Sequence, residues 1–181
     1  RMSRRRVVIT GLGLITPVGN SVAESWSNIL AGRSGIANVT KFDASGLACR
    51  FAGEVKDFKV EDWMPAKDAR HMDVFIHYGI AAGVQAMLDG GLAVTDANAE
   101  RLGVNIGSGI GGLPMIEDTH NDFLGGGPRK ISPFFIPGTI SNMISGNLSI
   151  MFGLKGPNLA VVTACTTGLH AIGLSARLIE Y

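Results

Sequence analysis

The sequence predicts an α/β fold with a mainly parallel sheet. Short apolar runs rich in β-branched residues alternate along the chain with segments whose apolar residues recur at helical spacing. This order is expected of strands joined by helical crossovers. Hydrophobic residues make up 46% of the 181 residues and charged residues 17%, a balance too apolar for a disordered chain. We therefore expect one globular domain with its own core.

The N-terminal part predicts a strand and then a helix. Residues 6–10 form a β-branched run that is followed by glycines, so we expect a buried strand and a tight turn. Asn20 or Ser21 is suited to cap a helix over residues 22–31, and Gly32 should end that helix.

The middle of the chain predicts irregular backbone, one long helix and a second strand. Residues 33–66 show no clear period, and we expect short strands near residues 51–55. Apolar residues at helical spacing predict a helix over residues 71–90, which a pair of glycines ends. Residues 101–108 then read as a buried strand that runs into a glycine-rich turn.

The last third of the chain predicts a loop, two helices and a third strand. Residues 114–138 are rich in glycine and proline, so we expect a long loop, and such a loop is usually functional or packs on a partner. A helix over residues 140–152, a strand over residues 158–163 and a helix over residues 164–181 should follow.

Charge and cysteine content exclude several classes of protein. The net charge of +1 gives no overall field that would attract nucleic acid, and we interpret the basic run at residues 4–6 as a solvated start of the chain. No stretch approaches the roughly 20 apolar residues of a membrane span, and no signal-peptide pattern opens the chain. Two cysteines make no disulfide framework, so we expect a reducing, cytoplasmic setting.

The early glycines suggest a nucleotide site, but the rest of the fingerprint is missing. Gly11 and Gly13 follow a predicted strand, but the third glycine of a dinucleotide fingerprint is missing. No acidic residue ends a second strand about 20 residues further on, where the ribose would need one. His71, His77 and His120 show no metal-ligand spacing with each other or with the cysteines. We therefore expect no cofactor and no metal.

Cys165 is the strongest candidate for a reactive group. It lies in Thr163-Ala-Cys-Thr-Thr-Gly168, between a predicted strand and a predicted helix. A sulfur at a helix N-terminus meets free N–H groups and the helix dipole, which favour the thiolate, and the same turn aims an N–H at a forming oxyanion. The alternative is a small buried hydrophobe, the usual fate of a lone cysteine. Geometry alone does not decide between a reactive and a structural cysteine.

The other cysteine and the nearest histidine predict structural roles. Cys49 lies in a segment without such a turn, so we interpret it as structural. His170 follows Cys165 by five residues, more than one helical turn. We expect its side chain to point away from the thiol, as a histidine of the core or one that supports the site indirectly.

Six blocks of the sequence together resemble one enzyme family. They occur in the same order as in β-ketoacyl-[acyl carrier protein] synthases, and the glycine-rich and Pro-Arg-Lys blocks look like type II rather than type I. The blocks are Val7-Val-Ile-Thr-Gly-Leu-Gly13, Thr16-Pro-Val-Gly-Asn20, Leu30-Ala-Gly-Arg-Ser-Gly-Ile36, Gly107-Ser-Gly-Ile-Gly-Gly112, Gly127-Pro-Arg-Lys-Ile-Ser-Pro-Phe-Phe135 and Thr163-Ala-Cys-Thr-Thr-Gly168.

The resemblance implies a fold, a reaction and an assembly. The fold is thiolase-like, a five-layered α-β-α-β-α arrangement of two similar halves, of which residues 1–181 would be the N-terminal domain. The reaction is condensation of an acyl thioester with malonyl-[acyl carrier protein], with loss of carbon dioxide, in fatty-acid elongation. Cys165 matches the nucleophile, while two catalytic histidines and a lysine belong to the C-terminal half. The strand at residues 158–163 would pair with its mate in a homodimer.

The resemblance also implies two binding surfaces. Ile110 and Phe135 match positions that line the acyl pocket, although ordinary core packing explains such residues equally simply. The basic residues that match the docking patch for the acidic acyl carrier protein are Lys67, Arg70, Arg129 and Lys130. Complementary charge of this kind speeds and orients encounter, and a plain solvated surface is the alternative for each. His71 stands where many relatives have a basic residue.

Two other functions share parts of this pattern. A polyketide-type ketosynthase has the same cysteine motif, and the products of the full-length protein would separate it from a fatty-acid enzyme. A non-catalytic partner subunit that only shapes chain length would typically lack the nucleophile, and Cys165 is present.

Overall fold

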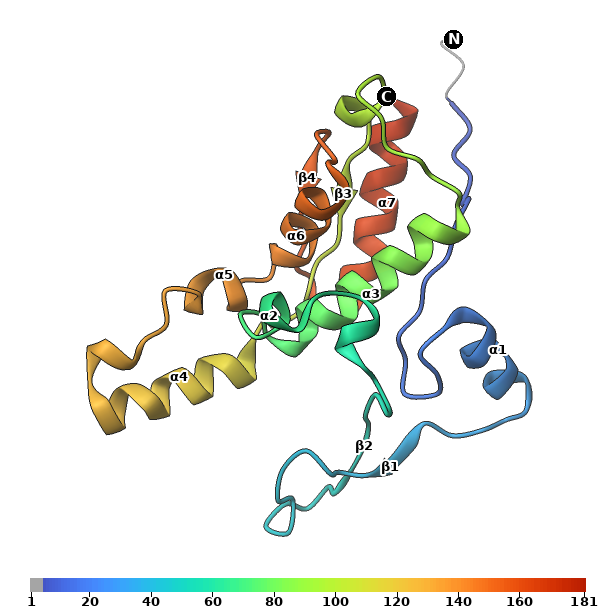
Figure 1. The fold of residues 1–181 in the computed structure, drawn as a ribbon. Helices are drawn as coiled ribbons and strands as arrows, with labels where there is room; N and C mark the ends of the chain where they lie inside the picture. The colour runs from blue at the N-terminus through green and yellow to red at the C-terminus, as the bar shows by residue number, and fades with distance from the viewer. Residues whose placement is uncertain (1–4) are drawn as a thin grey trace.

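The computed structural model describes residues 5–181. The first four residues of the expected domain, and so Arg4 of the basic run, lie outside the described residues. Helices and strands mix along the chain as an α/β fold requires, and two segments project from the main body (Figure 1). One is the segment of α4 (Leu113–Gly126), and the other holds β1 (Ile36–Asn38) and β2 (Phe51–Gly53).

The expected strand at residues 6–10 does not form. These residues pair with no strand, and the side chains of Val8 and Ile9 are exposed. A strand needs a neighbour that takes up its backbone hydrogen bonds. The backbone just beyond this run binds helix α3 (Val74–Asp89) instead, because Leu12 donates its N–H to the carboxylate of Asp89 at 2.9 Å.

The glycines that follow this run allow the chain to touch α3. A Cβ at Gly13 would lie 1.9 Å from the carbonyl oxygen of Ala82, and one at Gly11 would lie 2.2 Å from that of Ala86. No side chain fits at such distances, so close backbone contact with a helix, rather than a strand-to-helix turn, accounts for the two glycines.

The first helix, α1 (Val22–Leu30), confirms the prediction to within one residue. Ser21 is its N-cap and accepts a hydrogen bond from the N–H of Glu24 at 3.2 Å. The carboxylate of Glu24 accepts the N–H of Asn20, the residue before the N-cap, at 2.8 Å, which ties the incoming chain to the first turn of the helix. Gly32 follows with a φ of +66°, a conformation that suits glycine.

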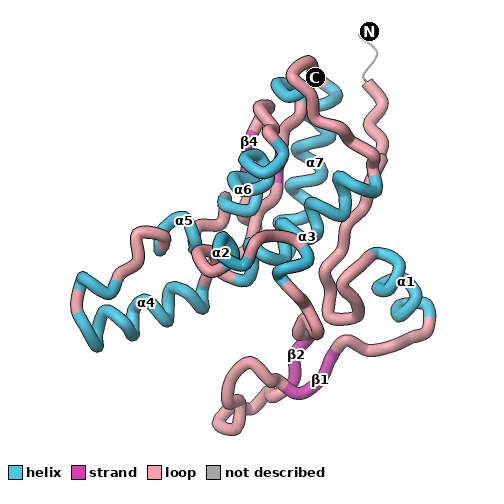
Figure 2. Tube along the Cα trace, viewed as in Figure 1, coloured by secondary structure: helices cyan, strands magenta, loops and turns pink. Residues whose placement is uncertain are grey.

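Residues 33–66 are mostly irregular, as predicted (Figure 2). The short strands β1 and β2 pair antiparallel, with Ala37 opposite Ala52. Two short helical pieces follow, a 3-10 turn over Val60–Asp62 and α2 (Ala66–Ala69).

Helix α3 begins three residues later than predicted, because Asp73 caps it. The Asp73 carboxylate accepts the N–H of Phe75, at the start of the helix. α3 packs on α6 (Met143–Phe152), and this contact is close because α3 carries glycines at the crossing. A Cβ at Gly79 would lie 2.5 Å from the Ile144 side chain, so a larger residue would push the helices apart.

The core lies between α2, α3 and α6. Its fully or nearly fully buried members are apolar and come from all three helices or their edges, which buries one face of each helix. They are Met64, Ala69, Ile76, Ile80, Ile144 and Leu148.

The expected loop at residues 114–138 is mostly helical, so that prediction was wrong. α4 covers its first half, a 3-10 turn covers Pro128–Lys130, and α5 covers Phe135–Thr139. Pro114 sits in the first turn of α4, where proline is tolerated because the N–H has no helical partner there. The proline that suggested a loop therefore starts a helix.

The parallel sheet is present but short. β3 (Val104–Asn105) pairs with β4 (Asn158–Leu159) in parallel, whereas we expected strands of eight and six residues over 101–108 and 158–163. Beyond the ladder the two segments stay close, since a Cβ at Gly107 would lie 1.8 Å from the carbonyl oxygen of Val161.

Helices on either side fix this sheet. The buried hydroxyl of Ser145 on α6 accepts the N–H of Ile106 at 2.8 Å and lies 2.8 Å from the carbonyl oxygen of Leu159. On α7 (Thr167–Glu180), the carbonyl of Ala171 accepts the side-chain N–H of Asn105 at 3.1 Å. These contacts tie both α6 and α7 to the short sheet, and the segment that follows β4 leads from the sheet into α7 (Figure 1).

Candidate active site

Cys165 lies in a tight turn between β4 and α7. The turn is a 3-10 helix over Ala164–Thr166 that runs into α7 at Thr167. Cys165 is exposed and its thiol is free. The position agrees with the predicted helix start, except that a 3-10 turn separates the thiol from the first residue of α7.

The residue before the cysteine has a strained backbone. Ala164 has a φ of +51°, in the left-handed region that non-glycine residues seldom adopt. Such residues persist where the surroundings hold them, and they cluster at functional sites. The strain therefore marks this turn independently of the cysteine itself.

A set of hydrogen bonds around Thr163 holds the turn. Its N–H donates to the hydroxyl of Thr167 at 2.9 Å, and its carbonyl accepts the N–H and the hydroxyl of Thr166 at 3.1 and 2.8 Å. Its own hydroxyl lies 2.7 Å from Nδ1 of His170. The ring is exposed, so His170 is not part of the core, and its indirect support of the site stays a prediction.

The glycine-rich segment at residues 107–112 borders this turn. A Cβ at Gly109 would lie 3.6 Å from the Cα of Ala164, so the backbone of the glycine segment passes directly beside the strained residue. Ile110 is next in the chain, and its side chain is 74% exposed. Ile110 is therefore brought near the cysteine turn, on the open side of the segment.

The same glycine segment also contacts α5, where Phe135 begins the helix. The N–H of Gly112 donates to the carbonyl of Thr139 at 2.8 Å, and a Cβ at Gly111 would lie 2.6 Å from the same oxygen. Phe135 is half-buried. The segments that carry Cys165 and Phe135 therefore both contact the glycine segment that carries Ile110.

The four basic residues lie on two separate segments. Lys67 and Arg70 belong to α2 and its C-cap, whereas Arg129 and Lys130 belong to the 3-10 turn after α4, and all four are exposed.

An aromatic stack joins the backbone just after α2 to the residue before α5. The ring of His71, which follows Arg70, stacks on Phe134 with ring centroids 3.8 Å apart and planes 22° apart. Directly after His71, the N–H of Asp73 donates to the carbonyl of Gly138 at 3.0 Å, and its carboxylate accepts the N–H of Met115 in the first turn of α4 at 2.8 Å.

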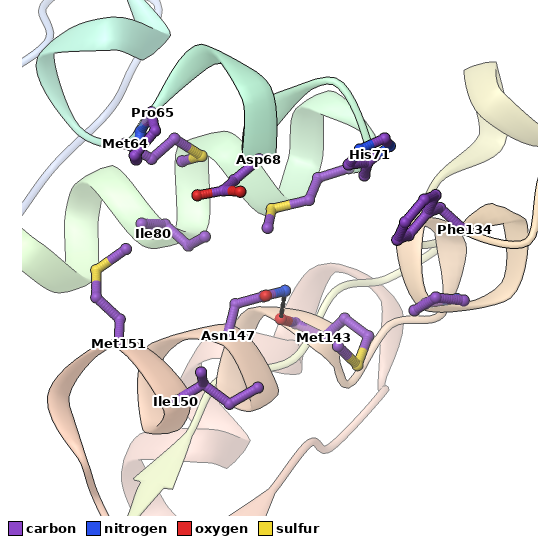
Figure 3. A pocket seen from close by; sticks show the side chains of 12 residues that line it. Met64, Pro65, Asp68, His71, Ile80, Phe134, Met143, Asn147, Ile150 and Met151 are labelled. Carbon is purple, nitrogen blue, oxygen red and sulfur yellow. Dashed lines mark hydrogen bonds between the residues drawn. The ribbon is translucent and has the colours of Figure 1, made fainter.

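An apolar cavity of about 540 Å³ opens between α2, α3 and α6 (Figure 3). Methionines supply much of its wall, Asp68 extends its carboxylate into it, and Phe134 and His71 stand at one end. None of the residues that the sequence singled out as catalytic or pocket-lining contributes to it. The methionines that line it come from two stretches distant in sequence, Met64 and Met72 on either side of α2 and Met143 and Met151 on α6, so no local pattern could have indicated it.

Cys49 is exposed, and its Sγ lies 3.6 Å from the carbonyl oxygen of Phe51 in its own loop. Within residues 5–181 no group of three His, Cys, Asp or Glu side chains is arranged to hold a metal ion. No helix in that range is both long and apolar enough to cross a membrane.

Known proteins match the chain over nearly all of its length. The family model "β-ketoacyl synthase, N-terminal domain" matches residues 4–181. A 3-oxoacyl-[acyl-carrier-protein] synthase 2 from Vibrio harveyi is 61% identical over 180 residues, which are 99% of this chain and 43% of that protein. The chain therefore spans less than half the length of this relative.

Solved structures agree with the sequence match. A β-ketoacyl synthase from Burkholderia phymatum STM815 superposes with a TM-score of 0.78 at 28% identity, over 98% of this chain and 44% of that one. A ketosynthase in a complex described as a type II PKS acyl-carrier protein with its ketosynthase bound to the hexaketide also has a TM-score of 0.78, at 25% identity, over 97% of this chain and 47% of that one. The fold is accordingly that of the N-terminal half of a thiolase-like ketosynthase. With the family model covering all but the first three residues, the chain belongs to the β-ketoacyl synthases.

Proposed function

We propose that the protein condenses an acyl thioester held on Cys165 with malonyl-[acyl carrier protein], with loss of carbon dioxide, in fatty-acid elongation. The observation that carries the proposal is the exposed thiol of Cys165 in a strained turn at the start of α7. The name of the Vibrio harveyi relative supports the same reaction.

The reaction has two stages that share one sulfur atom. In the first, the thiolate of Cys165 attacks the carbonyl carbon of the acyl thioester, a C–S bond forms, and the thiol of the donor leaves. In the second, the malonyl carboxylate leaves as carbon dioxide, and the resulting enolate attacks the acyl carbon. The new C–C bond replaces the bond to sulfur, so the thiolate of Cys165 is restored.

The second stage needs groups beyond those of this chain. An enolate is stabilised by donors aimed at its developing oxygen charge, and from the family resemblance we expect two histidines and a lysine of the C-terminal half to act there. In this proposal, residues 1–181 supply the nucleophile and part of the wall of the acyl site.

Ile110 and Phe135 are proposed to line the acyl pocket. Ile110 follows Gly109, which borders Ala164 in the cysteine turn, and the helix of Phe135 contacts the same glycine segment through Gly112. Apolar side chains gathered beside the nucleophile suit an acyl chain, because burying that chain removes apolar surface from water.

The exposed basic residues on α2 and on the 3-10 turn are proposed to dock an acyl carrier protein. The solved ketosynthase in complex with its acyl carrier protein supports a partner of this kind. Lys67, Arg70, Arg129 and Lys130 would meet the acidic face of the carrier. We also propose that the full-length protein is a cytoplasmic homodimer, with residues 1–181 as one domain of it.

Mass spectrometry of the full-length protein tests the nucleophile. After incubation with an acyl thioester, the wild-type protein should gain the mass of one acyl group, and Cys165→Ala should gain none and lose condensation. Cys49→Ala is the matched control, since Cys49 is also an exposed, free thiol, and it should take up the acyl group normally. Condensation by Cys165→Ala at a rate near that of the wild type would reject the assignment.

Product analysis separates the runner-up function. A polyketide-type ketosynthase is favoured by the ketosynthase in complex with a hexaketide. Full-length protein supplied with acyl-carrier and malonyl-carrier should release β-ketoacyl products extended by one unit. Chains with several unreduced keto groups would instead support the polyketide alternative.

A further inference from the structure

His170 makes one specific contact although its side chain is exposed. Its Nδ1 lies 2.7 Å from the hydroxyl oxygen of Thr163, two residues before Cys165. We propose that His170 and Thr163 form a clasp that positions Cys165 for acyl transfer, so that both are positioning residues. This inference rests on the proposed function of Cys165.

Thr163 is suited to this role because all its polar groups are engaged. The backbone N–H and C=O bind Thr167 and Thr166, on the far side of the cysteine. The turn that contains Cys165 is therefore closed on itself around Thr163. The hydroxyl, which is not needed for this closure, is left to bind His170.

The strain at Ala164 explains why a clasp is needed. Ala164 joins Thr163 to Cys165 and has a φ of +51°. A non-glycine residue in this region relaxes unless neighbouring contacts hold it. If Thr163 were free to rotate, Ala164 could relax toward an ordinary conformation and the thiol would change direction.

His170 supplies a fixed anchor for the hydroxyl of Thr163. It lies on α7, one turn after Thr167, where the helix is regular. The neighbouring residue on this helix, Ala171, is buried and its carbonyl binds the side chain of Asn105 on β3. The clasp thus ties the strained turn to a helix that is itself tied to the sheet.

Paired substitutions in the full-length protein test the clasp. Thr163→Val removes the hydroxyl and keeps the branched shape, whereas Thr163→Ser keeps the hydroxyl. His170→Ala removes the ring, whereas His170→Asn puts a polar amide group near the position of Nδ1. For each variant we would measure the single-turnover rate of acyl transfer, kcat and KM, and the rate at which iodoacetamide alkylates Cys165.

Thr163→Val and His170→Ala should each slow acyl transfer about tenfold, since small misplacements of reacting groups cost at least this much. KM should change little, and the alkylation rate of Cys165 should shift as well. Thr163→Ser and His170→Asn should come within about twofold of the wild type. The double variant Thr163→Val/His170→Ala should be no slower than either single variant, because both remove the same contact.

Three results would overturn the clasp. These are wild-type acyl transfer in both Thr163→Val and His170→Ala, losses that the conservative variants do not reverse, and losses that add in the double variant. Should Thr163→Val unfold, His170→Ala and His170→Asn carry the test, because position 170 is exposed. Alkylation requires no acyl substrate, so a failure of Cys165 to take up acyl groups rejects the proposed function and leaves the clasp to be decided by the alkylation rates.

Discussion

At the scale of single residues, the candidate site depends on backbone conformations that surround one thiol. Cys165 is presented by a strained alanine on one side and by the start of α7 on the other. A second backbone segment passes beside this turn at Gly109, where an added Cβ would lie in ordinary van der Waals contact, 3.6 Å from the Cα of Ala164. Ile110 follows at once, with its side chain 74% exposed.

Ile110→Phe in the full-length protein should shift its products toward short acyl chains. A phenyl ring would occupy space that a long acyl chain must enter, and overpacking of this kind costs roughly 1–3 kcal/mol. The measurement is the profile of kcat/KM against acyl length. Ile29→Phe is the control, since Ile29 is also an exposed isoleucine but lies on α1, and it should leave the profile unchanged. An unaltered profile in Ile110→Phe would argue against a pocket role for Ile110.

The sequence indicated which residue is the candidate nucleophile but not how its turn is held. The motif around Cys165 predicted a turn at the start of a helix, and the spacing of five residues predicted that His170 points away from the thiol. Neither the left-handed backbone of Ala164 nor the contact between Thr163 and His170 could be predicted, because both depend on how the turn closes. Several hydrogen bonds together set this geometry, and no repeating pattern in the sequence indicates it.

At the scale of elements, strands were harder to predict than helices. α1, α3, α6 and α7 follow from apolar spacing and caps, which are local properties of the sequence. The run at residues 6–10 has the composition of a strand, yet strands form only where a neighbour accepts their hydrogen bonds. α4 was missed for a different reason, because its proline lies in the first turn, where a helix tolerates proline.

The basic residues of the 3-10 turn after α4 should help to dock the carrier protein. Charge reversal at Arg129 and Lys130 in the full-length protein should raise KM for carrier-bound substrates by about tenfold at low salt, because complementary charges steer and orient encounter. Small thioester mimics should be used normally. The effect should fade as ionic strength rises, since exposed charges are screened over about 8 Å at physiological salt.

A matched control distinguishes docking from general charge effects. Arg101 and Lys155 are an exposed basic pair away from both segments, and their reversal changes the net charge by the same amount. The control variant should use carrier-bound substrates like the wild type. Equal losses with carrier-bound and small substrates in the Arg129 and Lys130 variant would indicate damage to the fold instead.

At the scale of the whole molecule, much apolar surface remains exposed. Leu169 and Ile172 on α7 are 71% and 64% exposed, and Val162 beyond β4 is 48% exposed. Exposed apolar patches of this kind mark surfaces that other protein covers. The edge of the short parallel sheet adds unpaired backbone groups, and such edges readily pair with another chain.

The 181-residue chain on its own should therefore self-associate and should not release carbon dioxide from malonyl-carrier. Light scattering should give a mass that rises with concentration, and Val162→Lys should lower it, because a charge along the edge opposes pairing. Leu30→Lys, at an exposed apolar position on α1, is the control and should change the mass less. A monomer at every concentration would contradict the first expectation, and steady release of carbon dioxide the second.

The carboxylate of Asp73 is shared between two helices, and close packing beside it limits how the protein can evolve. It accepts one N–H at the start of α3 and another at the start of α4, whose own N-cap is the glycine Gly112. A Cβ at Gly112 would lie 2.8 Å from the Cβ of Asp73. A Cβ at position 112 would also lie 2.9 Å from the Cα of Thr139, so we expect descendants of this sequence to keep glycine at 112 whatever residue stands at 73.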